Sequence, residues 1–362
     1  MRRLLALAAC GLLAACGSSG AAGADPAPAS STGAPSLSGA AAPGAPSGSS
    51  TAGTAATAAT AGPVVIAATT AAAAAPAASG PTGGACGDKV CSSIERCEGG
   101  QCVPACPAGE VYVPPTPPEG FTMGRGKIPY GFGKLKGGTP GNGIADTPHT
   151  VVLTKPFCMD ATEVTVRAIV RCVQEQGCRE PSIFDRWATY PKKPDHPVNM
   201  VEWSIAKEYC EKQGQSLPTE AQWEWAATGG DGRDWPWGNE TPTCEHADFT
   251  QGDLPSPGGD AGCHGGGPSP VGTHTKGDRV LPTGRIHDLA GNVWEWTLDS
   301  YGRFTKDPVT DPVRLVEGDL THVVKGGGWN RSHRGIMSWF RGAAIHTYKV
   351  PGLGFRCVRN PK

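Results

Sequence analysis

Apolar residues recur at helical spacing in three segments of the C-terminal two-thirds of the chain. Thr165 can cap the first predicted helix, because a threonine hydroxyl accepts a hydrogen bond from a free first-turn amide. Ser204 can cap the second helix, which Gly214 ends, and Thr219 with Gln222 has the spacing of a capping box for the third. The predicted buried positions are Ile169, Cys172 and Val173 in the first helix, Ala206, Tyr209 and Cys210 in the second, and Trp223, Ala226 and Ala227, before Gly229-Gly230, in the third.

Outside these helices, residues 106–362 alternate short apolar segments with glycine, proline and asparagine. This texture is typical of short strands joined by long loops. All ten tryptophans lie between Trp187 and Trp339, so the large core-forming side chains belong to this part of the chain. We therefore predict one irregular α+β domain over 106–362, which is long enough to bury a core.

The first sixteen residues have the pattern of an export signal. A positive start, MRR, precedes an apolar run over 4–15 that is shorter than the roughly 20 residues needed to span a bilayer. The residues LAAC that end at Cys16 resemble a bacterial lipobox, which predicts a lipoprotein signal peptide over 1–16 and lipidation of Cys16. An ordinary secretory signal is the alternative. Gly17 after the anchor favours the bacterial outer membrane or the cell surface.

Residues 17–85 consist almost entirely of alanine, glycine, serine, proline and threonine, with no aromatic residue and Asp25 as the single charge. Such a segment cannot bury enough apolar surface to offset the entropy cost of ordering it. We predict a disordered linker that tethers the folded part to the membrane.

Charge is balanced along the chain. The 362 residues include 32 Lys and Arg against 33 Asp and Glu, a formal net charge of −1 at pH 7, and no basic run follows the N-terminal arginines. Surfaces that bind nucleic acid need concentrated positive charge to neutralise phosphates. We therefore expect no nucleic-acid partner.

Two cysteines fall in the signal region and twelve follow it, and an even number in an exported chain favours disulfides formed in an oxidising compartment. Four of them, Cys86, Cys91, Cys97 and Cys102, crowd the small segment 86–105, which has almost no core-forming side chains and must be held by its bridges. Zinc is the alternative, disfavoured by the irregular spacing and the lack of a C-x2-C pair. The pairing within this segment stays open.

A series of motifs runs in order through the rest of the chain. They are FTMG at 121–124, PH at 148–149, EVT at 163–165, PV at 197–198, SLPTEAQWEW at 216–225, WGN at 237–239, GNVWEW at 291–296, KGG at 325–327 and GFRC at 354–357. Their order and spacing resemble the sulfatase-modifying-factor family, whose type member is the formylglycine-generating enzyme. The resemblance covers about residues 106–360 and implies a single compact domain of C-type-lectin-like topology.

The resemblance also implies how the other eight cysteines pair. Cys210, on the second predicted helix, and Cys357, on the last strand, match positions that are bridged in family members. The remaining expected pairs are Cys244 with Cys263, Cys172 with Cys178, and Cys106 with Cys158. This assignment leaves no free thiol after residue 85.

In the family, a loop of mixed carboxylate and carbonyl oxygens binds calcium, and the matching residues here are Asp288, Gly291, Val293 and Glu295. Calcium prefers such hard oxygen ligands and tolerates irregular geometry. The resemblance therefore implies a structural Ca²⁺ ion. The alternative is that the two carboxylates only satisfy buried loop amides.

A second family calcium site has a weaker match. Its ligands correspond to Asp248 and to the carbonyl of Phe249, while Asp260 lies in the returning loop at a different spacing. We expect this second site to be the less complete of the two.

The strip 325–341, with the sequence KGGGWNRSHRGIMSWFR, departs from the enzyme. The enzyme oxidises a substrate cysteine with copper held by two cysteines in this strip, and Cu(I) prefers soft sulfur ligands. The strip contains no cysteine, so copper-thiolate catalysis is not expected. The soft ligands near it are His333, His346 and Met337, which leave a non-cysteine metal site as an alternative.

In the family fold this strip lines the cleft, which makes it the predicted ligand-binding surface. Its aromatic, basic and hydrogen-bonding side chains suit a protein, peptide or glycan ligand. They are Trp329, Asn330, Arg331, His333 and Arg334. A solvated loop with one core tryptophan is the alternative. Arg341 and Arg356 match family arginines and are expected to pair with acidic groups.

Two functions fit these observations. The first is a surface-tethered, calcium-stabilised recognition or accessory module without copper-thiolate catalysis. The alternative is an exported oxidoreductase of the same family that acts on protein or peptide substrates through a non-cysteine metal site. No G-x-S-x-G or H-E-x-x-H motif offers other catalytic chemistry.

Overall fold

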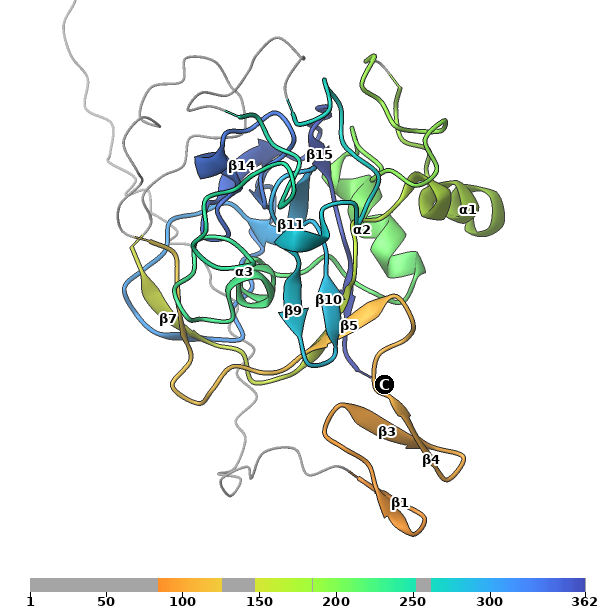
Figure 1. Ribbon diagram of the computed structural model, residues 1–362, viewed down its shortest axis with the longest axis vertical. Helices are drawn as coiled ribbons and strands as arrows, with labels where there is room; N and C mark the ends of the chain where they lie inside the picture. The colour runs from red at the N-terminus through yellow and green to blue at the C-terminus, as the bar shows by residue number, and fades with distance from the viewer. Residues whose placement is uncertain (1–83, 126–146, 184, 252–261, 362) are drawn as a thin grey trace, which may run out of the picture. The chain divides into compact units, whose positions relative to one another are not determined.

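Three α-helices and many short strands make up the described part of the chain (Figure 1). The computed structural model describes residues 84–125, 147–183, 185–251 and 262–361. The helices are α1 (Val166–Gln176), α2 (Trp203–Lys212) and α3 (Glu220–Thr228), with the 3-10 turns η1 (Thr275–Gly277) and η2 (His333–Ile336). The predicted α+β class with three helices is confirmed.

Every strand is short, as the loop-rich sequence predicts. The strands are β1 (Ala85–Cys86), β2 (Lys89–Val90), β3 (Glu95–Glu98), β4 (Gln101–Pro104), β5 (Glu110–Val113), β6 (Phe121–Met123), β7 (His149–Val152), β8 (Phe157–Asp160), β9 (Arg279–Leu281), β10 (Gly284–Ile286), β11 (Trp294–Ser300), β12 (Val309–Thr310), β13 (Thr321–Lys325), β14 (Gly342–Ile345), β15 (Leu353–Gly354) and β16 (Val358–Arg359). The predicted signal peptide with Cys16, nearly all of the predicted linker, and Asp260 lie outside the described residues.

Two of the three helix starts agree with their local sequence signals. The Thr165 hydroxyl accepts from the amide of Ala168, and α1 ends at a left-handed Gly177. Thr219 and Gln222 form the predicted capping box, in which each side chain bonds to the other residue's backbone amide. These ends are set by contacts within four residues, which is why sequence alone predicts them.

Helix α2 starts earlier than its predicted serine cap. Glu202 occupies the N-cap position without a side-chain hydrogen bond, and Ser204 lies inside the first turn. The amide of Trp203 donates instead to the carbonyl of His346, at 3.0 Å. A distant segment therefore accepts the hydrogen bond of the first helical amide, and the predicted cap at Ser204 is wrong.

The largest sheet has the order β14-β13-β11-β15, in which β11 pairs antiparallel with β13 and parallel with β15. Helix α3 packs against β11 and β13. Two three-stranded sheets, β12-β7-β6 and β16-β8-β5, complete the domain with a small β9–β10 ribbon. The strands β15 and β16 come from the same short C-terminal segment, so this segment joins two different sheets.

The core forms around buried tryptophans. Trp294 and Trp296 of β11 lie in one hydrophobic cluster with α1 and α2, and Trp223 of α3 belongs to a second cluster. Trp329 is also buried. Indole rings of this size dominate the apolar area removed from water. The tryptophan-rich segment of the sequence is therefore the structural centre of the domain.

All twelve cysteines after residue 85 form disulfides. The four bridges implied by the resemblance are present, namely Cys106–Cys158, Cys172–Cys178, Cys210–Cys357 and Cys244–Cys263. Several disulfides in one chain are typical of an oxidising location, periplasmic or extracellular. Within the described residues, the helices are all too short or too polar to cross a membrane.

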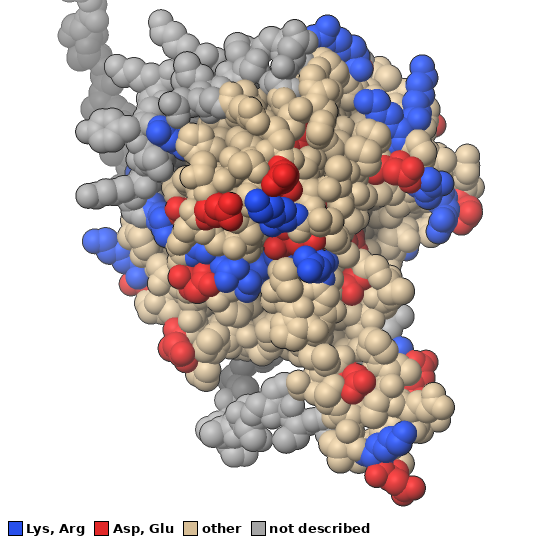
Figure 2. Space-filling view, viewed as in Figure 1, with Lys and Arg blue, Asp and Glu red and all other residues tan. Residues whose placement is uncertain are grey.

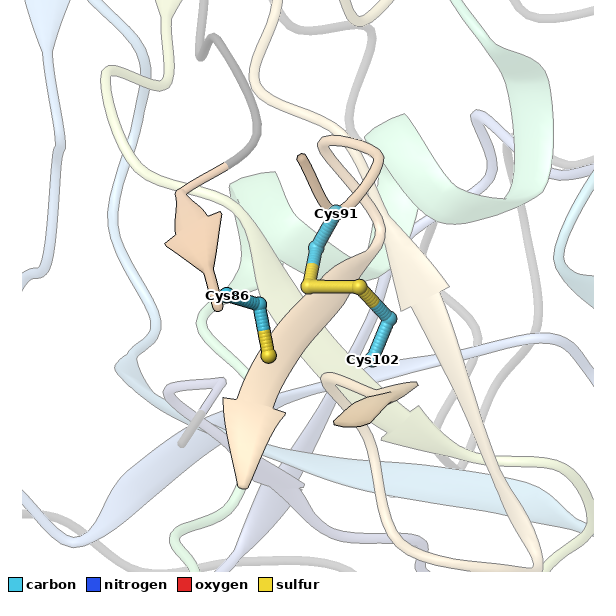
Figure 3. A group of neighbouring side chains, drawn as sticks. All are labelled: Cys86, Cys91 and Cys102. Atoms are coloured by element: carbon cyan, nitrogen blue, oxygen red, sulfur yellow. A yellow bond between two sulfur atoms is a disulfide. The ribbon is translucent and has the colours of Figure 1, made fainter. Parts of the chain in front are cut away.

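The small Cys-rich segment consists of two hairpins, β1–β2 and β3–β4. Its bridges, which the sequence left open, are Cys86–Cys97 and Cys91–Cys102, and each joins one hairpin to the other. Figure 3 shows the sulfur of Cys86 beside the Cys91–Cys102 bond, and the sulfur atoms of these three residues lie within 4.8 Å of one another. Because these sulfur atoms are bonded in pairs, no thiolate is available there for a metal.

Candidate functional site

The loop between β10 and β11 carries the predicted calcium ligands. Three of its residues, Asp288, Gly291 and Asn292, have positive φ angles of 57°, 81° and 55°. A Cβ atom on Gly291 would lie 2.3 Å from the carbonyl oxygen of Asp248, so only glycine fits here. The amide of Asn292 donates to the same oxygen at 2.9 Å. The structure therefore brings the two predicted calcium segments together.

Glu295, at the start of β11, is fully engaged by protein donors. Its carboxylate accepts two hydrogen bonds from the Arg356 guanidinium at 2.7 Å, and one from the Trp223 indole at 2.7 Å. Glu295 and Arg356 are both completely buried. Arg356 thus pairs with an acid, as predicted, and Glu295 would have to rearrange to bind an ion.

Arg341, the other arginine expected to pair with an acid, does so at Glu220 on α3. The two N–H···O distances are 2.7 Å and 2.6 Å. Both side chains are about 5% exposed. The expectation that these two arginines brace the core is confirmed.

Glu163 is a buried acid that is not among the predicted calcium ligands. Its Oε1 accepts a hydrogen bond from the side-chain Nδ2 of Asn292 at 3.0 Å, while its Oε2 is buried and has no hydrogen-bond partner among the described residues. Burial, with repulsion from Asp288, raises the pKa of Glu163 well above its usual range. Burial also raises the pKa of Asp288. Asn292 and Glu163 are 129 residues apart, so only the fold could reveal this contact.

Charge is unbalanced in this region, where Glu163, Asp288 and Glu295 lie near the guanidinium of Arg356, and the imidazole of His287 also acts on Asp288. Buried carboxylates are costly unless a cation or hydrogen bonds compensate them. Asp288 receives one backbone hydrogen bond, from Gly272 at 2.5 Å. The donors present there, carboxylate oxygens and loop carbonyls, are of the type that a hard cation such as calcium prefers.

In the second predicted site, Asp248 accepts hydrogen bonds from the protein, and Asp260 lies outside the described residues. The Asp248 carboxylate accepts from the amide of Cys263 at 2.9 Å and from the hydroxyl of Ser269 at 2.7 Å. Asp248 and Phe249 are both buried. Ser269, which was not predicted, helps to explain why this acid is tolerated in the interior.

The strip 325–341 runs from β13 through η2 toward β14. Its first residue, Lys325, is buried and pairs with Glu224 at 2.8 Å. Trp329 is only 1% exposed and packs against Trp187, so it belongs to the core rather than to the surface of the strip. The side chains that reach the surface are all half-buried, and they are Asn330, Arg331, His333 and Arg334.

Arg331 gives the strip its chemical character. Its guanidinium carbon lies 5.7 Å from the centre of the Trp294 ring, and burial lowers its pKa. A partly desolvated guanidinium beside an aromatic ring binds carboxylate groups more strongly than an exposed one does. The strip can therefore recognise an anionic group, but it offers no sulfur to a metal other than Met337.

The surface has no large field of one sign on the face that Figure 2 shows, where acidic and basic side chains are interspersed. A small polar hollow of about 170 Å³ lies elsewhere, beside Gln215, Gln222 and Arg359. It contains no catalytic grouping. The strip remains the surface with the most distinctive chemistry.

The curated relatives of this chain include enzymes and a protein named as inactive. The formylglycine-generating enzyme of Thermomonospora curvata is 38% identical over 184 residues, which cover 47% of this chain and 57% of the relative. The Bos taurus enzyme of the same name is 34% identical, over 47% of this chain and 46% of the relative. The Bos taurus protein named inactive C-alpha-formylglycine-generating enzyme 2 is also 34% identical, over 46% of this chain and 51% of the relative. The chain spans about half the length of these relatives.

The fold and a family model point the same way. PvdO from Pseudomonas aeruginosa has a similar structure, with a TM-score of 0.52 and 22% identity, covering 69% of this chain and 94% of PvdO. At this identity the likeness concerns the fold alone. The model of the sulfatase-modifying factor enzyme 1-like domain matches residues 120–361. This chain therefore belongs to the sulfatase-modifying factor family.

Proposed function

We propose that this chain is a surface-tethered, calcium-stabilised recognition or accessory module that does not use copper-thiolate catalysis. The strip 325–341 carries the proposal. Where the family's enzyme is expected to hold copper between two thiolates, this strip has no cysteine and presents the half-buried Arg331. The twelve cysteines from Cys86 to Cys357 are all held in disulfides, so none of them can supply a thiolate.

Overall similarity favours neither an enzyme nor a non-catalytic protein. A relative named as an enzyme and a relative named as inactive match this chain at the same 34% identity. The choice therefore depends on the side chains of the strip. A cation beside aromatic rings suits binding of a protein, peptide or glycan that carries an acidic group.

The function is tested by metal analysis and turnover on the purified full chain. We expect calcium as the retained metal and no formylglycine formed from a cysteine-containing sulfatase peptide when copper is supplied. The Thermomonospora curvata relative serves as the positive control. Stoichiometric copper or iron together with turnover would contradict the recognition role and favour the oxidoreductase alternative.

The calcium part of the proposal rests on the unbalanced buried carboxylates. Asp288 and the carbonyls of Gly291 and Val293 belong to the β10–β11 loop, and Glu163, with one oxygen that lacks a hydrogen-bond partner among the described residues, lies beside it. A divalent cation would offset the repulsion between the carboxylates of Asp288 and Glu163. Binding to the folded state alone stabilises that state by mass action. Calcium would therefore hold the β10–β11 loop in place.

Removing calcium is expected to lower the melting temperature of the parent protein. Chelator should have little effect on Asp288→Asn, because that variant has lost a charged ligand. Asp195→Asn is the matched control, since Asp195 pairs with Arg167 and both side chains are exposed. Differential scanning calorimetry with and without chelator measures the effect. An unchanged melting temperature in the parent would show that this loop holds no calcium.

Surface tethering is proposed from residues 1–85. A lipid on Cys16 and a linker of small and polar residues would keep the disulfide-bonded part near the outer membrane or cell surface. Cell fractionation decides this point. Recovery of the full chain in the soluble fraction would rule out the anchor.

A further inference from the structure

His274 is a buried histidine whose ring has no hydrogen-bond partner in the described part of the chain. His274 immediately precedes η1 and is 5% exposed. Both of its ring nitrogens, Nδ1 and Nε2, are buried. A neutral imidazole has one donor and one acceptor nitrogen. Leaving both unsatisfied in the interior costs free energy, so an unpaired ring of this kind calls for an explanation.

A second imidazole lies beside it. His264 is exposed, and its ring centre is 5.7 Å from that of His274, with 30° between the ring planes. Two imidazoles that share one tetrahedral ion, with metal–nitrogen bonds of about 2.0–2.1 Å, have ring centres about 5–6 Å apart. The observed separation is therefore suitable for a shared metal ion.

The surroundings of this pair favour a cation. The carboxylates of Asp248 and Asp288 both attract positive charge at His274. Asp248 is held by Cys263 and Ser269, which fixes one negative charge in the interior. Imidazole nitrogen is a ligand for zinc and its neighbours in the first transition row, whereas calcium takes oxygen ligands.

We propose that His264 and His274 form a binding site for a divalent transition ion of the zinc class. The ion binds one nitrogen of each ring, and water completes its coordination. The site differs in ligand chemistry from the calcium loop and does not depend on the proposed recognition role. It also differs from the strip, where the histidine is His333.

Zinc titration of the full chain by calorimetry tests the site. The protein is first freed of metal and then kept in excess calcium, so that the oxygen-rich loop does not compete for zinc. We expect one equivalent of zinc to bind, with affinity reduced at least about tenfold in His274→Phe and in His264→Ala. Cobalt absorption gives a second readout, because a d–d spectrum reports direct coordination rather than folding.

His196→Ala is the matched control, since it removes a half-buried histidine that lies outside the proposed site and outside the strip. It should bind zinc and cobalt as the parent does. Phenylalanine at position 274 keeps the buried volume, and His264→Ala changes an exposed residue, so the second variant decides the matter if the first does not fold. Parent-like zinc binding by His264→Ala, or no zinc binding by the parent, would show that the two rings lie side by side without forming a metal site.

Discussion

Replacing Arg356 with methionine is expected to lower the free energy of unfolding by about 3–5 kcal/mol, the usual cost of removing one partner from a buried ion pair. The guanidinium is fully buried and donates two hydrogen bonds to Glu295. It also attracts the charges of Glu163 and Asp288. Its removal would leave these three buried carboxylates without a guanidinium beside them.

The matched variant is Glu295→Gln, which should cost less. Arg356 would then still face the negative charges of Glu163 and Asp288, and a glutamine oxygen can still accept from Trp223. Urea unfolding in the presence of chelator measures both variants without a contribution from calcium. Arg167→Met, at an exposed ion pair, should leave the unfolding midpoint unchanged. If Glu295→Gln proved the more damaging change, Arg356 would not be the counter-charge for the whole cluster.

Lower pH should partly restore the stability of the Arg356→Met variant. Because burial raises the folded-state pKa of Glu163 and of Asp288, their stabilising contribution is present below the unfolded pKa and is lost as pH rises through the folded pKa. The difference between variant and parent should therefore shrink as pH falls. Comparison at each pH is needed because burial lowers the pKa of His322, which destabilises both proteins in acid.

Removing the Cys210–Cys357 bridge by a double alanine substitution is expected to cost about 5 kcal/mol on the chain-entropy scale for a closed loop of this length. The two cysteines are 147 residues apart in sequence. The bridge fastens α2 to the segment between β15 and β16. Opening it removes the longest disulfide-closed loop among the described residues and gives the unfolded chain the most additional freedom.

The short bridge Cys172–Cys178 provides the control. Its cysteines are only six residues apart, so the same model predicts a loss of about 2 kcal/mol for its double alanine variant. All four cysteines are buried, which makes the lost packing comparable. Equal losses for the two variants would indicate that packing, rather than chain entropy, sets the contribution of these bridges.

Sequence alone predicted the features that depend on near neighbours or on the family resemblance. The caps at Thr165 and Thr219 are local, and four disulfides followed from the resemblance. The predicted cap of α2 was wrong because the first helical amide donates to the carbonyl of residue 346 instead of to a local side chain. No local sequence pattern predicts that Glu163 Oε2 and the ring of His274 are buried without a hydrogen-bond partner among the described residues. Each feature depends on segments that meet only in the folded chain.

The short segment that supplies β15 and β16 has a consequence for the order in which the domain is made. Residues 353–359 provide a strand beside β11, a strand beside β8, the counter-ion of Glu295 and the partner of Cys210. Synthesis proceeds from the N-terminus, so β8, α2 and β11 all leave the ribosome before the residues that complete them. The domain must therefore remain incomplete until this late segment has emerged.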